Sequence, residues 1–292
     1  MTHYLIAGAG GMLGTALQTV LTTRGVPFDA PGEAAFDITD AEAVEAQVRG
    51  FAGALAPGVR GVLVNAAAYT NVEQAEDHPD VAFAVNEHGA RLLAEAARDA
   101  GLGFVHISTD FVFDGTKVGG YTEYDEPAPL SIYGMSKLAG EHAVHAAYAY
   151  ALIVRTAWVF GENGANFPTK ILDLAERMPT LKVVTDEIGS PTYTIDLAEG
   201  IIGLVEARAH GIYHLAGAGS CSRFELAQAV LELAGMDNAI EPVLAAQLPA
   251  RAARPANSVL DCAKAAALGV TMPPWRDALE RFIAERPGQA AS

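Results

Sequence analysis

The chain has 292 residues, 51% hydrophobic and 18% charged, a composition that allows one large or two moderate domains and excludes a disordered chain. Lys and Arg number 19 and Asp and Glu 35, and the resulting charge of −16 repels phosphate polyanions, so we expect no nucleic-acid partner. Only two cysteines, Cys221 and Cys262, are present, which excludes a disulfide framework and a thiolate zinc cluster and favours a reducing compartment.

The first residues, MTHYLIAGAGGMLG, do not resemble a signal peptide, because they lack a basic segment and glycines interrupt their apolar run. The longest uncharged apolar run, near residues 146–154, is far shorter than the ~18 residues that span a bilayer. We therefore expect a cytoplasmic protein with no membrane partner. The sequence does not decide between a monomer and a homodimer.

The first half alternates short apolar runs with segments of helical period. In chain order we predict a strand at 4–7, a helix at 13–21, a strand at 26–30, a helix capped by Asp40, a strand at 62–64, a helix at 81–100, a strand at 104–107, a helix at 131–147 and a strand at 152–154. The strand runs show no apolar and polar alternation, which indicates strands buried on both faces. The sequence therefore predicts a doubly wound parallel (Rossmann-type) α/β fold.

Prolines break the second half into shorter pieces, which indicates a smaller region of another kind. Within it, GIYHLA at 211–216 is typical of a strand that rejoins the large sheet. We expect a dinucleotide-binding domain at 1–155, rejoined by about 192–216. An interleaved α+β substrate-binding domain would comprise 156–191 and 217–292.

Glycines at 8, 11 and 14 form a G-x-x-G-x-x-G turn between the first predicted strand and helix. Missing side chains let such a turn tighten and let a pyrophosphate approach backbone N–H groups. No G-K-[ST] follows, which excludes a P-loop. The alternative is an ordinary glycine-rich turn that binds no phosphate. Residues in the later loops are needed to distinguish the two.

Two later loops fit an adenosine. Asp37 and Ile38 follow the second predicted strand, where a carboxylate can bind the adenine amino group while an aliphatic side chain packs on the ring; Asp37 or Asp40 capping the next helix is the alternative. The small side chains of NAAAY at 65–69 leave backbone free to approach a ribose.

Tyr133 and Lys137 are four residues apart and share one face of a predicted helix, where the ammonium stabilises a tyrosinate and lowers the pKa of the phenol. A hydroxyl from Thr109 or Ser108, at a strand end, can orient a substrate carbonyl beside them. An isolated Tyr-x-x-x-Lys is usually a surface pair. Its occurrence together with the glycine turn favours a proton-transfer site.

The segments GAGGMLG, NAAAYTNVEQAE, VHISTDFVFDG and YGMSKLAGE resemble the extended short-chain dehydrogenase/reductase superfamily. More narrowly, RTAWVFGENGANF, EIGSPTYTIDLA, GIYHLAGAGSCSRFELA and RPANSVLD resemble the dTDP-4-dehydrorhamnose reductase family, over about residues 3–283. The resemblance implies an NADPH- or NADH-dependent oxidoreductase. Its substrate would be a dTDP-linked deoxysugar, dTDP-4-dehydro-6-deoxy-L-mannose, reduced at the C4 ketone to dTDP-L-rhamnose.

The resemblance also implies roles for individual residues. Tyr133 would protonate the developing alkoxide, Lys137 would lower the pKa of Tyr133 and hold the nicotinamide ribose, and Thr109 would bind the sugar oxygen. Trp158 would offer a flat face to the sugar or the nicotinamide edge, with a plain core aromatic as the alternative. The cofactor-binding candidates are Gly8, Gly11, Met12, Leu13, Gly14, Asp37, Ile38, Ala67, Ala68, Tyr69, Tyr133 and Lys137. The substrate-binding candidates are Ser108, Thr109, Asp110, Tyr133, Trp158 and Arg254.

Charged residues raise two further questions. The C-terminal cations to compare with the substrate diphosphate are Lys170, Lys182, Arg223, Arg251 and Arg254, although most such residues are solvated or ion-paired surface charges. Some family members bind Mg²⁺ through glutamates at a dimer contact. No carboxylate cluster here demands a metal, so we expect none.

The cofactor preference stays open between NADH and NADPH. Family members often carry a basic residue shortly after the second strand, whereas this segment reads DAPGE at 29–33, and no Lys or Arg lies between Arg24 and Arg49. Asp29 or Glu33 would repel the 2′-phosphate of NADPH.

Two alternatives to this function remain. One is a 4-ketoreductase or epimerase acting on another nucleotide deoxysugar. The other is a non-catalytic regulatory subunit that resembles the methionine adenosyltransferase β subunit and binds a dinucleotide without turnover. The presence of Thr109, Tyr133 and Lys137 together counts against the regulatory subunit, and fold alone does not separate these possibilities.

Overall fold

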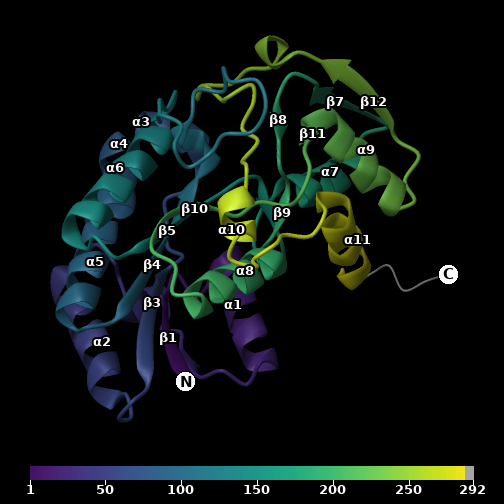
Figure 1. Cartoon of the computed structure of the whole chain (residues 1–292). Helices are drawn as coiled ribbons and strands as arrows, with labels where there is room; N and C mark the ends of the chain where they lie inside the picture. Colours follow the sequence, from purple (N-terminus) through teal and green to yellow (C-terminus); the bar gives the residue numbers. More distant parts are fainter. Residues whose placement is uncertain (287–292) are drawn as a thin grey trace.

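The computed structural model describes residues 1–286, and a six-stranded sheet lies at its centre (Figure 1). The strands are β1 (Thr2–Ala7), β2 (Phe28–Asp29), β3 (Arg60–Asn65), β4 (Gly103–Thr109), β5 (Leu152–Thr156) and β10 (Gly211–His214). They are all parallel, in the order β2-β1-β3-β4-β5-β10, which confirms the predicted doubly wound sheet. The direction of winding reverses between β1 and β3, and ligands of such folds bind at that point.

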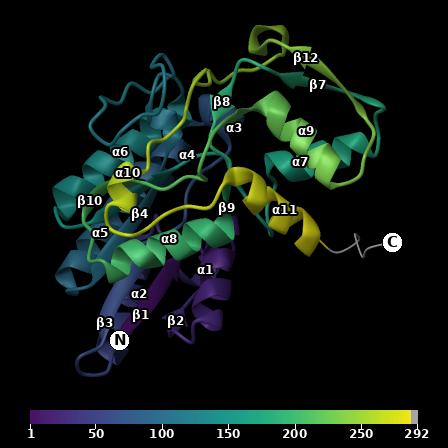
Figure 2. The ribbon, with the colours of Figure 1, turned by 45° about the vertical axis from the view of Figure 1, so that its right-hand side comes forward.

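Helices cover both faces of the sheet (Figures 1 and 2). On one face α1 (Met12–Thr23) packs against α8 (Thr194–Glu206), over an apolar core that includes Leu17 and Ile201. The other face carries α2 (Ala41–Ala54), α4 (Pro79–Phe83), η2 (Ala84–Gly89), α5 (Ala90–Asp99) and α6 (Ile132–Ala147). The two apolar cores explain why the strands lack polar alternation.

Local signals account for most element ends. Asp40 caps α2, because its Oδ1 accepts hydrogen bonds from the N–H groups of Glu42 and Ala43. The prediction of a single helix at 81–100 is wrong about its continuity. It is divided into α4, the π-helical η2 and α5, and a π-helical turn inside a helix often marks a functional site.

A second core lies beside the sheet, at the upper right of Figure 1. Its helices are α7 (Phe167–Ala175), α9 (Arg223–Leu233) and α11 (Trp275–Glu285). Its strands form three pairs: β7 (Thr180–Val184) with β12 (Ala239–Val243), β8 (Ile188–Gly189) with β11 (Cys221–Ser222), and β6 (Val159–Phe160) with β9 (Thr192–Tyr193). Phe160, Leu226 and Phe282 lie in this core and are almost fully buried.

The chain passes from the sheet to the second core and back. β10 pairs with β5, which confirms the predicted return of GIYHLA to the sheet. α10 (Ala263–Ala266) and Met272 pack into the core on the α8 face, although they fall within the predicted substrate domain at 217–292. Residues 287–292 of that prediction lie outside the described residues. Within 1–286, no helix is long and apolar enough to cross a membrane.

Candidate active site

The glycine turn after β1 is packed against the end of β3. Gly8 has a φ of +78°, and a Cβ there would lie 2.5 Å from the backbone nitrogen of Ala67. A Cβ on Gly14 would lie 2.2 Å from the carbonyl oxygen of Gly8, so α1 also requires glycine at that position. The Gly11 N–H donates to the Gly8 carbonyl at 3.1 Å and closes the turn.

The start of α1 fits a phosphate. No side chain caps the helix, so N–H groups of its first turn remain for a ligand. The side chains of the two candidates here are already engaged: Leu13 lies in the core, and Met12 packs against Gly164 and the amide of Asn166. Met12 and Leu13 can therefore contact a pyrophosphate only through their backbone.

The loop after β3 is held by a residue that the sequence analysis missed. Ala67 and Ala68 are half-buried, and the next residue, Tyr69, exchanges two backbone hydrogen bonds with the side chain of Asn86, at 2.9 and 3.1 Å. Asn86 lies in η2 and also donates to the Ser136 hydroxyl of α6 at 2.9 Å. The sequence gives no signal for this role, because Asn86 is one of several polar residues in 81–100 and its partners are distant in the chain.

The adenosine-side candidates differ in their surroundings. Asp37 is exposed, and its Oδ1 accepts from the N–H and hydroxyl of Thr39 at 2.8 and 2.7 Å, which lowers the pKa of Asp37. The Ile38 side chain is buried against Gly89 of η2 instead of lying open to a ring. Asp40, not Asp37, caps α2.

Lys137 is buried beneath the site. Its Nζ donates to the carbonyl of Ile107 in β4 at 2.6 Å, and burial lowers its pKa to about 8, against the opposing charge of Glu141. Glu141 is itself held by Arg155 of β5 through two hydrogen bonds of 2.8 and 2.6 Å, and both side chains are 2% exposed. Lys137 therefore occupies a fixed position over the end of β4.

Tyr133, Thr109 and Asp110 meet at the carboxyl end of β4. Burial raises the pKa of Tyr133 to about 12, opposite to the lowering by Lys137 that the sequence predicts; a hydrogen bond with Thr109 lowers it and the Asp110 charge raises it further. The Thr109 hydroxyl donates to Asp110 Oδ1 at 2.9 Å. Burial raises the pKa of Asp110 to about 6. Thr109 supplies the hydroxyl beside Tyr133, because the two side chains share a hydrogen bond, whereas the buried Ser108 hydroxyl has no hydrogen-bond partner among the described residues.

Trp158 is held in an unusual position. Its φ of +46° is rare for an aromatic residue, and its ring packs against Gly189, where a Cβ would lie 2.3 Å from Cε2. The Arg223 guanidinium lies over the ring, 3.4 Å from its centroid. One face of Trp158 is therefore covered by Arg223, and the role expected for this ring toward the sugar or the nicotinamide stays a prediction.

The other candidate cations are paired or remote. Arg254 forms an ion pair with Glu73 of α3 (Val72–Asp77) and donates to the Ala252 carbonyl at 3.3 Å. Arg251 pairs with Asp77, Lys182 lies 3.6 Å from Glu241, and Lys170 is exposed on α7.

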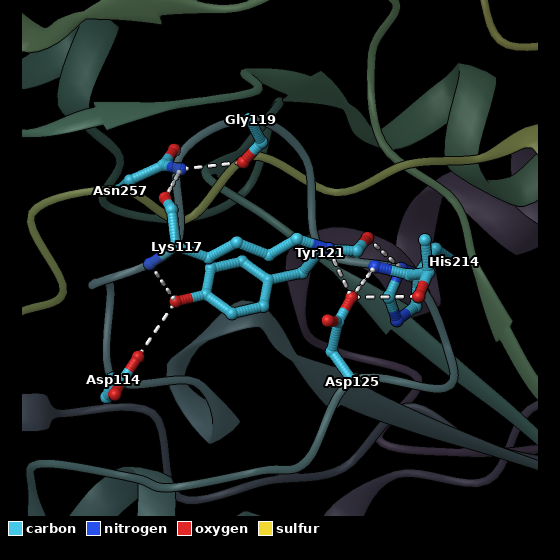
Figure 3. A network of polar contacts seen from close by, with 8 residues as sticks. Asp114, Lys117, Gly119, Tyr121, Asp125, His214 and Asn257 are labelled. Atoms are coloured by element: carbon cyan, nitrogen blue, oxygen red, sulfur yellow. Dashed lines mark hydrogen bonds and ion pairs between the residues drawn. The ribbon is translucent and has the colours of Figure 1, made fainter.

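The loop between β4 and α6 is tied to the segment that carries Arg254 (Figure 3). The Asn257 side-chain amide donates to the carbonyls of Lys117 and Gly119, each at 2.7 Å. The Tyr121 hydroxyl donates to Asp114 at 2.8 Å, and Lys117 pairs with Asp125 at 2.6 Å. These contacts fix segments far apart in the sequence beside the end of β4.

A glycine turn at the switch point of a parallel sheet, with a half-buried Tyr beside a strand-end hydroxyl and a buried Lys one helical turn further on, defines the class: a dinucleotide-dependent oxidoreductase. The sequence profile of the RmlD substrate binding domain matches residues 2–287. The chain belongs to this family, the family of dTDP-4-dehydrorhamnose reductases.

Individual relatives agree with the family. The chain is 41% identical to dTDP-4-dehydrorhamnose reductase of Mycobacterium tuberculosis, over 96% of this chain and 92% of that protein. It is 39% identical to the spore coat polysaccharide biosynthesis protein SpsK of Bacillus subtilis, over 98% of both. The crystal structure of dTDP-4-dehydrorhamnose reductase from Bacillus anthracis in complex with NADP has a TM-score of 0.91 and 38% identity, covering 97% of this chain and 99% of that one.

Proposed function

We propose that this protein reduces the C4 ketone of dTDP-4-dehydro-6-deoxy-L-mannose to give dTDP-L-rhamnose, with NADPH or NADH as hydride donor. The observation that carries this proposal is the meeting of Tyr133, Thr109 and Asp110 at the end of β4, the strand whose Ile107 carbonyl binds the buried Lys137. Family membership supports the substrate, since relatives at about 40% identity bear the name of this reaction.

The residues around the switch point fit a nicotinamide dinucleotide. The crowded turn at Gly8 and Gly14 and the uncapped start of α1 would hold the pyrophosphate, and the loop at 67–69 would lie along a ribose. When bound, the nicotinamide supplies the hydride. The Lys137 ammonium would hold the nicotinamide ribose while it remains bonded to the Ile107 carbonyl.

Hydride addition to a ketone places negative charge on its oxygen, so the site must supply a proton and a fixed donor. Tyr133 keeps its proton at neutral pH, because burial raises its pKa, and it would give that proton to the alkoxide. The Lys137 charge then favours the tyrosinate that remains. Thr109 would turn its hydroxyl from Asp110 to the ketone oxygen, which leaves Asp110 to accept from a sugar hydroxyl.

We also propose a division of labour between the two cores. Residues 1–155 with 192–216 would bind the dinucleotide, and 156–191 with the segment from 217 onwards would bind the nucleotide sugar. Trp158 and Arg254 lie on the substrate side of this division, and Ser108, near the end of β4 in the dinucleotide part, remains a substrate-binding candidate. A cytoplasmic enzyme is proposed, and light scattering after gel filtration decides between a monomer and a homodimer.

An absorbance assay at 340 nm tests the reaction, with NADH and NADPH each combined with the dTDP-4-ketosugar and with other nucleotide 4-ketosugars. We expect net oxidation of at least one cofactor with the rhamnose precursor. Tyr133→Phe should bind cofactor normally and lose at least about 100-fold in kcat, whereas Tyr150→Phe, at an exposed position, should not. No oxidation with either cofactor refutes the proposal. Sugar interconversion without net oxidation indicates an epimerase, and inertness together with co-purification of a synthetase indicates the regulatory subunit.

A further inference from the structure

Arg223 is the first residue of α9 and stands out among the arginines of the second core by its surroundings. Its guanidinium lies flat on the Trp158 ring, at 3.4 Å from the centroid, and 4.9 Å from the centroid of Phe167. Close contact with the Trp158 ring restrains the guanidinium, and its N–H donors lie along the edge of that group, with only Nε near a carboxylate, that of Glu187. The position is therefore preorganised.

The donors of Arg223 are not used inside the protein. Within residues 1–286 the guanidinium makes no hydrogen bond, and its only ion pair is a loose one, at 3.8 Å from Glu187. By contrast, Arg155 and Arg281 each bind a carboxylate through two hydrogen bonds. A guanidinium that is only 17% exposed and carries five donors without an acceptor favours an anionic ligand.

The surroundings place this group near the reacting atoms. Burial lowers the pKa of Arg223 to about 10, and the opposing charges of Glu187 and Asp110 place its guanidinium near Asp110, the residue next to Thr109. Asp110 is buried and is hydrogen-bonded to Thr109 and Ser258. Arg223 therefore lies near the polar residues at the end of β4. In a 4-ketosugar nucleotide, the diphosphate is attached at C1, across one pyranose ring from the ketone at C4. An anion-binding group near Asp110 fits that spacing.

We infer that Arg223 binds the diphosphate of the nucleotide sugar, with its guanidinium held flat by Trp158 and Glu187 as the counter-ion that the ligand displaces. This inference rests on the proposed function. It explains how a chain of charge −16 retains a dianionic substrate: the charge is supplied by one stacked arginine instead of a general positive field. Planar guanidinium and phosphate geometry match through two parallel hydrogen bonds.

Equilibrium binding of dTDP and of thymidine to the purified protein, measured by calorimetry, tests the inference. Arg223→Gln should weaken dTDP binding by about 10- to 100-fold, as expected for lost charged hydrogen bonds, and leave thymidine binding within about twofold. The dTDP affinity of Arg223→Lys should lie between those of the wild type and Arg223→Gln, because a lysine keeps the charge but lacks the paired N–H donors of a guanidinium. Arg276→Gln, at an exposed arginine of α11 paired with Glu232, is the matched control and should change neither ligand.

A second variant separates ligand binding from a merely structural ion pair. Glu187→Gln removes the competing carboxylate, so dTDP should bind at least as tightly as to the wild type, while a structural role predicts weaker binding. NADH binding and the melting temperature report whether each variant is folded. Equal dTDP affinity in wild type and Arg223→Gln, or equal losses for dTDP and thymidine, overturns the inference alone. If the wild type binds no dTDP, the proposed substrate class fails as well.

Discussion

Asn86 donates a hydrogen bond to the Ser136 hydroxyl at 2.9 Å, and this bond joins the π-helical segment to the helix that carries Tyr133 and Lys137. The Asn86 side chain also accepts a hydrogen bond from the Tyr69 N–H and donates one to the Tyr69 carbonyl. Ser136 in turn donates to the Tyr133 carbonyl at 2.8 Å. One amide therefore couples the loop proposed to contact a cofactor ribose to the backbone of the proposed proton donor.

Asn86→Ala should raise KM for NADH or NADPH by about tenfold, because the loop at Tyr69 loses both of its anchoring hydrogen bonds. Asn238→Ala is a suitable control, since it also removes two side-chain hydrogen bonds, but in the second core. Steady-state kinetics with varied cofactor measures the effect. If both variants lose stability equally and neither changes KM, Asn86 is a structural residue only.

Gly14→Ala should destabilise the protein by about 1–3 kcal/mol and weaken cofactor binding, because its Cβ would meet the Gly8 carbonyl, which is backbone and cannot move aside. A Cβ on Gly10 would meet no atom within 4 Å, so the melting temperature of Gly10→Ala should be close to that of the wild type. Thermal unfolding with and without NADH compares them. Similar melting temperatures for the two variants would contradict the close approach of α1 to the turn.

Activity should fall as the pH rises through about 8, because Lys137 loses the charge that favours the tyrosinate. Lys137→Arg keeps its charge to higher pH, so the alkaline limb of kcat/KM should move upward even though the rate itself is lower. A pH profile of both proteins with the same substrate shows this. An alkaline limb at the same pH in both proteins would assign it to another group.

Asp110 makes stability depend on pH in the opposite sense to most carboxyls. Its pKa is about 6 in the folded protein and 3.8 as the ordinary value, so the neutral form favours folding. The neutral carboxyl contributes fully to the free energy of unfolding below pH 4. As the pH rises to about 6 this contribution is lost, and the free energy of unfolding falls by about 3 kcal/mol. Denaturation of wild type and Asp110→Asn from pH 4 to 7 measures it. A constant difference between the two proteins over that range would refute this assignment.

NADH should support turnover at least as well as NADPH. β2 ends at Asp29, opposite Leu5 of β1, and no Lys or Arg lies between Arg24 and Arg49; Arg24 itself pairs with Glu199 and Glu206. Ala30→Arg should shift the ratio of kcat/KM toward NADPH by at least about tenfold, by offering the 2′-phosphate a cation. Ala46→Arg, on the exposed face of α2, adds the same charge elsewhere and should not. A strong NADPH preference in the wild type would contradict the prediction.

The sheet was predictable because its strands are buried on both faces and therefore read as unbroken apolar runs. Most strands of the second core were not, since β6, β8, β9 and β11 have two residues each. A pattern of two residues carries no periodicity. The division at η2 was also hidden, because the apolar spacing of 81–100 is compatible with an unbroken helix.

The site divides in a similar way. Short spacings in the sequence made two pairs of residues predictable. Gly8 and Gly14 belong to one glycine turn, and Tyr133 and Lys137 lie one helical turn apart on α6. Arg223 was only one of several candidate cations, since the sequence does not show which arginine finds a carboxylate and which stacks on Trp158. Asn86 gave no signal of its own because its partners lie 17 and 50 residues away. Contacts of that kind exist only after the chain has folded.

The return of the chain to its sheet has a consequence for synthesis on the ribosome. When Thr156 has been made, β5 is an open edge, and α1 lacks the helix that covers it; both partners, α8 and β10, come only after β6, α7, β7, β8 and β9. An exposed apolar edge strand invites aggregation. The sheet of the nascent chain therefore lacks its last strand until residues up to His214 have been synthesised. Fragments that end near residue 155 should be insoluble.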